Sequence, residues 1–326
     1  MPGVLKTKLV TLFVAISLCV TWFLWTYYEA NGNSNDTLTP FVFSADSHIH
    51  NRYDQLPSVW RARIGGNWMA GRLCDAFAQG DTLTDPVYQN IFGFYNAAWL
   101  FLTFALIIGL ADNALLVIAL VFAGMCYSLT PPDAVAIFPW DMPSMFFWTL
   151  CFLLWQRGKY LWMLVAIVAG TAFKETVAVT AFLFFFTSIS WRKRWMFFGA
   201  AAVGCLLLKL DITTAVLGHP VIFTADSSGH SSGKVFQDAV TPHLNHFVWV
   251  NAGTFILALF LPIHSALDKG TKLVLAVFLV GLILACILAG TAFEFRQFLD
   301  VLPISVFYLD RTMQRWRIVE TGSGRL

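Results

Sequence analysis

The segment GTAFKETVAVTAF, residues 170–182, places Lys174 and Glu175 side by side in an apolar region that extends from Leu161 to Trp191. If this region lies in a membrane, both charges stand where an ionised group is costly. Ionisable residues in such places usually pair with one another and line a functional cavity. The segment therefore poses two questions: whether the surrounding chain crosses a membrane, and what the two charges do there.

The composition answers the first question. The chain has 326 residues, of which 58% are hydrophobic, 16% aromatic and only 12% charged, whereas about 25% of residues are charged in a soluble domain. Several uncharged runs approach the ~20 residues that a membrane-spanning helix requires. We therefore predict an all-α, polytopic membrane protein, with residues 1–326 forming a single integral membrane domain.

Ten apolar stretches are candidate spans, which puts both termini on the same side of the membrane. They are residues 9–28, 91–110, 114–130, 135–155, 160–173, 176–190, 195–210, 248–263, 273–290 and 299–309. The region 160–190 is divided into two spans because one long helix would put the basic sequences QRGK and WRKR on opposite sides. Each half is short, about 21 Å at 1.5 Å per residue, so one long helix stays open as an alternative.

The basic residues orient these spans. The side that holds the termini carries 13 of the 21 Lys and Arg residues, namely Lys6, Lys8, Arg157, Lys159, Arg192, Lys193, Arg194, Lys269, Lys272, Arg311, Arg315, Arg317 and Arg325. Cytoplasmic loops carry an excess of Lys and Arg, so both termini are predicted to be cytoplasmic. Two long loops, residues 29–90 and 211–247, then face outward.

The first external loop contains an amphipathic helix in its second half. The sequence PSVWRARIGGNWMAGRLCDAF, residues 57–77, spaces its large apolar side chains at helical intervals and places Arg61, Arg63 and Arg72 between them. Such a helix lies on a membrane with its Arg side chains near the headgroup phosphates. The alternative is a surface helix that only anchors the loop.

Further charges converge on the same outer side as Lys174 and Glu175. Asp141 lies in PWDMP, where Pro139 and Pro143 interrupt a regular helix. It is expected either to cap the following helix or to line a polar cavity. Glu294 and Arg296 lie in FEFRQFLDVLP between two spans, where they can pair with each other. Asp46 and Asp54 lie in the first external loop, where a lone Asp is more often solvated than catalytic.

The sequence gives little evidence for a metal site or for nucleotide binding. Five of the six cysteines lie in apolar runs, so no disulfide framework is predicted; Cys74 is the one in a predicted loop. The sequence has no zinc-site spacing, and no metal ligand is assigned, although Asp46 together with a substrate phosphate suits Mg²⁺ or Mn²⁺. There is no phosphate-cradling loop or dinucleotide fingerprint, and no nucleic-acid partner is expected.

The chain resembles bacterial members of the GT-C class of polytopic glycosyltransferases in three successive segments: PWDMPSMFF, GTAFKETVAV and FEFRQFLDVLP. Members of that class often carry an aromatic–Asp–x–Pro segment, an Arg-Glu-Thr segment and a late Glu–x–Arg segment before a Pro. They also have an acidic residue in the first outer loop, followed by an Arg-rich stretch. The resemblance covers roughly residues 40–310. Lys174 stands where Arg is commoner in the class, and Asp46 has no adjacent acidic partner.

The resemblance implies an enzyme of the bacterial inner membrane that takes a sugar from a polyprenyl-phosphate-linked donor. Cations hold the leaving phosphate, and a carboxylate deprotonates the hydroxyl of a lipid or glycan acceptor. By position in the class, Asp46 is the expected base, with Asp54 close enough to be confused with it. Asp141 and Glu175 are expected to shape the cavity and orient Lys174, and Glu294 to support the site. The expected phosphate-binding residues are Lys174, Arg296, Arg61 and Arg63.

Two other functions fit the same residues. A small-solute transporter also uses paired charges and proline-broken helices, but its charges gather at the midplane and its halves are commonly repeats. A non-catalytic membrane subunit of an envelope-assembly complex is the third reading. Loss of sugar transfer on substitution of the charged residues distinguishes the enzyme from both.

Overall fold

The computed structural model describes residues 2–32, 63–78, 85–129, 140–217, 299–300 and 302–322. Within these ranges the chain is helical apart from short turns, and it contains no strand, so the predicted all-helical class is confirmed. Three of the described helices are long and apolar enough to cross a membrane: Thr7–Leu24, Asn90–Leu110 and Trp191–Ala215. Membrane association is therefore supported by length and composition.

The chain divides into two compact units. The first consists of Met1–Leu110 and Thr130–Ser228, and the second of Ala111–Leu129 and Gly229–Leu326. Each unit is described by itself below. All the charged residues of the candidate site that the structure describes belong to the first unit.

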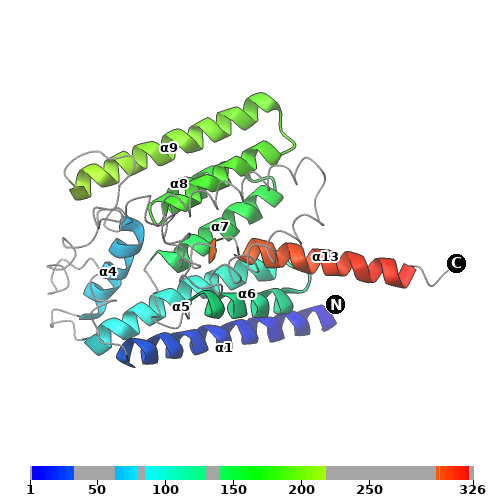
Figure 1. The fold of residues 1–326 in the computed structure, drawn as a ribbon, viewed down its shortest axis with the longest axis horizontal. Coiled ribbons are helices and arrows are strands. Elements are labelled where there is room, and N and C mark those ends of the chain that lie inside the picture. Colours follow the sequence, from blue (N-terminus) through cyan, green and yellow to red (C-terminus); the bar gives the residue numbers. More distant parts are fainter. Residues whose placement is uncertain are drawn as a thin grey trace, which may run out of the picture. The chain divides into compact units, whose positions relative to one another are not determined.

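The first unit begins with a long N-terminal helix. This helix, α1 (Pro2–Gly32), packs lengthwise against α5 (Asp85–Leu110), as Figure 1 shows. Between them in sequence comes α4 (Ile64–Ala78), which also contacts α5. On α1 the side chains of Leu9, Phe13 and Val20 are exposed, as expected of a helix that faces lipid on one side.

The other helices of the first unit follow one another through short turns. They are α7 (Asp141–Gln156), α8 (Tyr160–Thr171), the 3₁₀ helix η2 (Glu175–Phe186) and α9 (Trp191–Leu217). α7 packs on α5, on α8 and on η2, and α8 and η2 both pack on α9. Figure 1 shows α8 and α9 side by side.

Two contacts fix the directions of these helices. Trp99 of α5 packs its ring against Phe146 and Phe147 of α7, and Arg157 after α7 donates a hydrogen bond of 3.2 Å to the carbonyl of Gly109 near the end of α5. Because Trp99 precedes Gly109 in α5 as Phe146 and Phe147 precede Arg157 in the other segment, α5 and α7 run parallel.

The turn from α7 to α8 depends on a glycine. Gly158 has a φ of 66°, a left-handed conformation that glycine adopts at little cost at the end of a helix. Its N–H donates to the carbonyl of Trp155 at 3.1 Å, and that of Lys159 donates to Leu154 at 2.8 Å. The predicted cytoplasmic sequence QRGK is therefore a tight reversal, which makes α8 antiparallel to α7.

The predicted break in region 160–190 is confirmed. α8 ends at Thr171 and η2 begins at Glu175, with Lys174 in an extended conformation between them. The twelve residues of η2 are wound as a 3₁₀ helix, which rises ~2.0 Å per residue instead of ~1.5 Å and so reaches ~24 Å rather than ~18 Å. The tighter, more extended winding makes this segment longer than an α-helix with the same number of residues.

The described part of the second unit consists mainly of α6 (Ala114–Leu129) and α13 (Leu302–Gly322), which pack together. The contact is close at Gly124, where an added Cβ atom would lie 3.0 Å from the side chain of Leu302. α13 corresponds to the predicted span 299–309 but continues to Gly322. The predicted spans 248–263 and 273–290 lie outside the described residues.

Several predicted boundaries were too narrow. α1 extends beyond 9–28, and α9 extends beyond 195–210 at both ends. The prediction ended each span where the apolar run ended, yet Lys and Arg are good helix formers. The polar WRKR sequence therefore continues α9 into its first turns. Conversely, the predicted span 135–155 is described as a helix only from Asp141.

Candidate functional site

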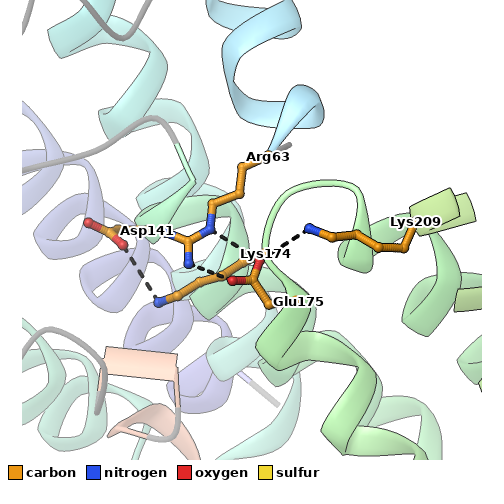
Figure 2. Close-up of polar contacts among 5 residues, drawn as sticks. All are labelled: Arg63, Asp141, Lys174, Glu175 and Lys209. Carbon is orange, nitrogen blue, oxygen red and sulfur yellow. Dashed lines mark hydrogen bonds and ion pairs between the residues drawn. The ribbon is translucent and has the colours of Figure 1, made fainter. Parts of the chain in front are cut away.

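Two charges are buried together in the first unit. Nζ of Lys174 lies 3.6 Å from Oδ1 of Asp141, as Figure 2 shows. Only 4% of Lys174 and 1% of Asp141 is exposed. An isolated ion at such a position carries a large desolvation penalty, and a counter-ion is what makes burial tolerable. Each residue therefore serves as a counter-ion of the other.

Helix ends bring this pair together. Asp141 is the first residue of α7, while the N–H of Lys174 donates to the carbonyl of Gly170 at 3.0 Å, which closes the last turn of α8. The expectation that Asp141 caps α7 was wrong. Trp140 holds the cap position without a side-chain cap hydrogen bond, and Asp141 lies one residue inside the helix. Pro143 falls in the first turn, where its missing N–H costs nothing.

Glu175 has partners of its own. Its carboxylate accepts two hydrogen bonds from Arg63, from Nη2 to Oε1 at 2.6 Å and from Nε to Oε2 at 3.1 Å. Nζ of Lys209, in α9, lies 4.0 Å from Oε2. The fork geometry of Arg63 is the strong, bidentate form of a charge-assisted pair. Glu175 therefore contacts Arg63 and Lys209, and its role in orienting Lys174 stays a prediction.

The first external loop supplies Arg63. The N–H of Gly65, at the start of α4, donates to the carbonyl of Ala172 at 2.9 Å. A Cβ atom on Gly65 would lie 3.0 Å from both the carbonyl carbon and oxygen of Ala172, so glycine is what permits this approach. Arg63 also stacks its guanidinium over the ring of Trp140, 4.9 Å from its centroid, a cation–π contact.

This placement corrects the expected role of Arg63. The predicted helix exists, as α4, and it includes Cys74 of the predicted external loop. Arg63, which precedes the helix, directs its guanidinium to Glu175 and Trp140 rather than toward lipid headgroups. On α4, the small residues Gly66, Ala70 and Gly71 are buried, whereas Trp68 is exposed. The small buried residues allow the helix to pack closely.

The charges lie in two neighbouring groups, the Lys174–Asp141 pair and the group of Arg63, Glu175 and Lys209. The five residues come from separate elements or turns and appear together in Figure 2. Among the described residues, these groups contain three cations and two carboxylates; Lys174, Asp141 and Lys209 are buried, and Arg63 and Glu175 are partly exposed. Cations gathered in this way suit an anionic ligand, and Arg and Lys both bind phosphate.

An aromatic layer lies beside the cluster. The ring of Phe173, next to Lys174, packs at 5.4 Å from Trp99 and 5.2 Å from Phe147. Gly170 keeps this layer close, because an added Cβ atom there would lie 2.6 Å from Val177 and 2.8 Å from Phe147. The layer excludes water from one side of Lys174, which strengthens the charge–charge interactions of the cluster.

Of the predicted site residues, the structure brings together Asp141, Lys174, Glu175 and Arg63. The remaining ones lie outside the described residues, namely Asp46, Asp54, Arg61, Glu294 and Arg296. In the portion of the chain that the structure describes, no group of three or more His, Cys, Asp or Glu residues is placed to hold a metal ion. The Mg²⁺ or Mn²⁺ site expected at Asp46 falls among the residues that are not described.

Sequence reasoning missed Lys209 and Trp140. Lys209 lies inside the apolar stretch Trp191–Ala215, six residues before its end, and a lone cation at such a position is itself a signal for a functional site. The predicted span 195–210 included Lys209 in its last turn, and no role was assigned to it. Trp140 was read only as part of a motif, and nothing in the sequence says that Arg63 reaches it.

No protein-family model, no curated protein and no solved structure matches this chain.

Proposed function

We propose that the protein is a GT-C-type membrane glycosyltransferase. It transfers a sugar from a polyprenyl-phosphate-linked donor to a hydroxyl of a lipid or glycan acceptor on the outer face of the bacterial inner membrane. The proposal includes the full architecture of about ten spans, both termini in the cytoplasm and one integral membrane domain. The proposal starts from the resemblance of the sequence motifs to the GT-C class.

The contact between Asp141 and Lys174 is the strongest support for the proposal. Asp141 of PWDMP and Lys174 of FKET belong to separate motifs of the resemblance, and their charged atoms lie 3.6 Å apart in a buried pair. The buried pair, with Glu175, Arg63 and Lys209 beside it, supplies the kind of fixed cations that a departing phosphate needs. The meeting of two motif residues is what a shared catalytic cavity requires.

The chemistry assigned to the site is a displacement at the anomeric carbon of the donor sugar. The acceptor oxygen forms a bond to that carbon, while the bond from the carbon to the phosphate oxygen breaks and its electron pair leaves with the polyprenyl phosphate. A carboxylate takes the proton of the acceptor hydroxyl. We assign this base to Asp46, and the stabilisation of the leaving phosphate to Lys174, Arg63, Arg61 and Arg296.

The position of the cluster favours the enzyme over a transporter. Of the described charged residues, Asp141 lies at the start of α7, Lys174 and Glu175 follow the end of α8, Arg63 precedes α4, and Lys209 lies in the C-terminal half of α9. A solute path is expected to place its ionisable residues near the bilayer midplane. A lipid-linked donor, in contrast, presents its phosphate near the membrane surface while its chain stays in the bilayer.

The test is sugar transfer by the purified protein from radiolabelled polyprenyl-phosphate sugars, with Lys174→Ala, Lys174→Arg and the exposed Lys193→Ala compared. Lys174→Ala is expected to lose most of its activity, because a charge is removed from the phosphate and Asp141 is left buried without its counter-ion. Lys174→Arg, which restores the residue commoner in the resembled class, retains activity, as does Lys193→Ala. Equal transfer by all variants would rule out the role of Lys174.

A further inference from the structure

Within the described residues, Lys209 is the cation of these groups with the longest contact to a carboxylate. Lys174 is matched by Asp141 at 3.6 Å, and Arg63 is matched by Glu175 through two hydrogen bonds. Lys209 shares the same Glu175, at 4.0 Å, which is beyond hydrogen-bonding distance. Since Arg63 already occupies both carboxylate oxygens, Lys209 is the cation whose charge Glu175 matches least.

Lys209 is also buried. Only 9% of it is exposed, and within the residues that the structure describes its ammonium makes no hydrogen bond. An ammonium has three N–H donors, and leaving them unmatched away from water is unfavourable. A lysine that reaches out of the membrane along its flexible stem would expose its charged end, which Lys209 does not do.

The position of Lys209 along α9 indicates which group can balance its charge. α9 begins at Trp191, and Trp191 and Trp195 are exposed beside Arg192 and Lys193, which is the composition of a membrane–water boundary. At 1.5 Å per residue Lys209 lies ~27 Å farther along the helix, close to the ~30 Å thickness of the hydrocarbon core. Measured from Trp191, Lys209 therefore stands close to the level of the opposite headgroup phosphates, and Leu206 and Leu207, near it in sequence, are exposed.

We propose that Lys209, together with the Arg63–Glu175 pair, forms a phosphate-binding subsite that holds the headgroup phosphate of a membrane lipid. A singly charged phosphate diester brings the triad of Arg63, Glu175 and Lys209 to neutrality and accepts hydrogen bonds from the Lys209 ammonium. The Arg63 guanidinium prevents the carboxylate of Glu175 from repelling the anion. In Figure 2, Lys209 and Asp141 lie on opposite sides of Glu175, so this subsite is separate from the Lys174–Asp141 pair.

The subsite shares Arg63 with the phosphate-binding residues of the proposed function, but its test uses no sugar donor, so either proposal can fail alone. The full-length protein, purified in detergent, is titrated with dioleoyl phosphatidic acid while its unfolding temperature is followed. Dioleoylglycerol has the same chains without the phosphate, and inorganic phosphate at matched ionic strength has the phosphate without the chains. Phosphatidic acid is expected to raise the unfolding temperature of the wild type, and dioleoylglycerol is not.

Lys209→Met is expected to weaken phosphatidic acid binding by about 10- to 100-fold, the effect of losing one charge-assisted hydrogen bond. Lys209→Arg keeps the charge and retains binding, and Lys193→Met serves as the control because Lys193 is exposed at the other end of α9. Without added lipid, Lys209→Met should unfold at the wild-type temperature or above it, because a poorly matched buried charge has been removed.

Three outcomes are decisive. If Lys209→Met binds phosphatidic acid as tightly as the wild type, the subsite does not exist. If Lys209→Met unfolds well below the wild type without lipid, the lysine has a protein partner and the inference fails. If inorganic phosphate alone stabilises the wild type but not Lys209→Met, the phosphate subsite stands, and its ligand is a free phosphate instead of a lipid.

Discussion

Asp141 begins α7 and Lys174 follows α8, and their charged atoms lie 3.6 Å apart in the protein interior. Removing one member of a buried ion pair costs about 3–5 kcal/mol, because the other is left uncompensated. Asp141→Asn and Lys174→Met are each expected to destabilise the protein by this order, and the double variant by less than the sum. Denaturant unfolding in detergent measures the coupling, and strictly additive effects would show that the pair does not interact.

The docking of α4 depends on the absence of a side chain at Gly65. A Cβ atom there would lie 3.0 Å from the backbone of Ala172, which is not free to move aside. Gly65→Ala is expected to separate α4 from the turn after α8 and to speed hydrogen exchange of residues 64–78. Gly199→Ala is the control, since nothing lies within 4 Å of its Cβ position. Unchanged exchange in Gly65→Ala would refute the close contact.

Arg63 holds Glu175 by a two-hydrogen-bond fork that lysine cannot reproduce. Arg63→Lys is therefore expected to lower the free energy of unfolding by about 1–2 kcal/mol, the lower part of the range for charged hydrogen bonds, because 38% of the Glu175 side chain is exposed. Arg72→Lys, whose side chain is exposed on the same helix, should change stability little. If the two substitutions have equal effects, the fork contributes nothing measurable.

The orientation of the chain is tested on α9, which carries exposed residues toward both ends. With Cys74 replaced by Ser, Asp211→Cys is expected to react with a membrane-impermeant thiol reagent in intact cells, and Lys193→Cys only after the cells are opened. The reason is the concentration of Lys and Arg at the WRKR end. Labelling of position 193 alone in intact cells would reverse the proposed topology.

The hydrophobic pattern predicted the helices because each apolar stretch is a local property of the chain. The break at Lys174 followed from charge alone, and the structure places α8 and η2 on either side of it. The ends of α1 and α9 were not predictable in the same way. Their flanking Lys and Arg residues are compatible with both helix and loop, so the apolar run underestimates the helix.

The ion pairs within the site could not be predicted from the sequence. The residues Asp141, Lys174, Glu175 and Arg63 were chosen correctly as members of one cluster, because each is a charge near an apolar segment. Which carboxylate meets which cation depends on helix rotation and on the approach of α4 at Gly65. Neither has a local signature, and Lys209 was missed for the same reason.

The central claim is that the outer-face cluster transfers a sugar from a polyprenyl-phosphate donor, and release of polyprenyl phosphate measures this most directly. Purified wild type is incubated with radiolabelled polyprenyl-phosphate sugars and an envelope extract as acceptor, beside Asp46→Asn, Asp54→Asn, Lys174→Ala and Lys193→Ala. We predict release by the wild type and Lys193→Ala, a fall of about 10²–10⁴ in Asp46→Asn from loss of the general base, and weakened donor use in Lys174→Ala. If Asp46→Asn and Asp54→Asn both keep the wild-type rate, Asp141 becomes the candidate base. If the wild type releases no polyprenyl phosphate, or if every variant matches it, the claim is contradicted.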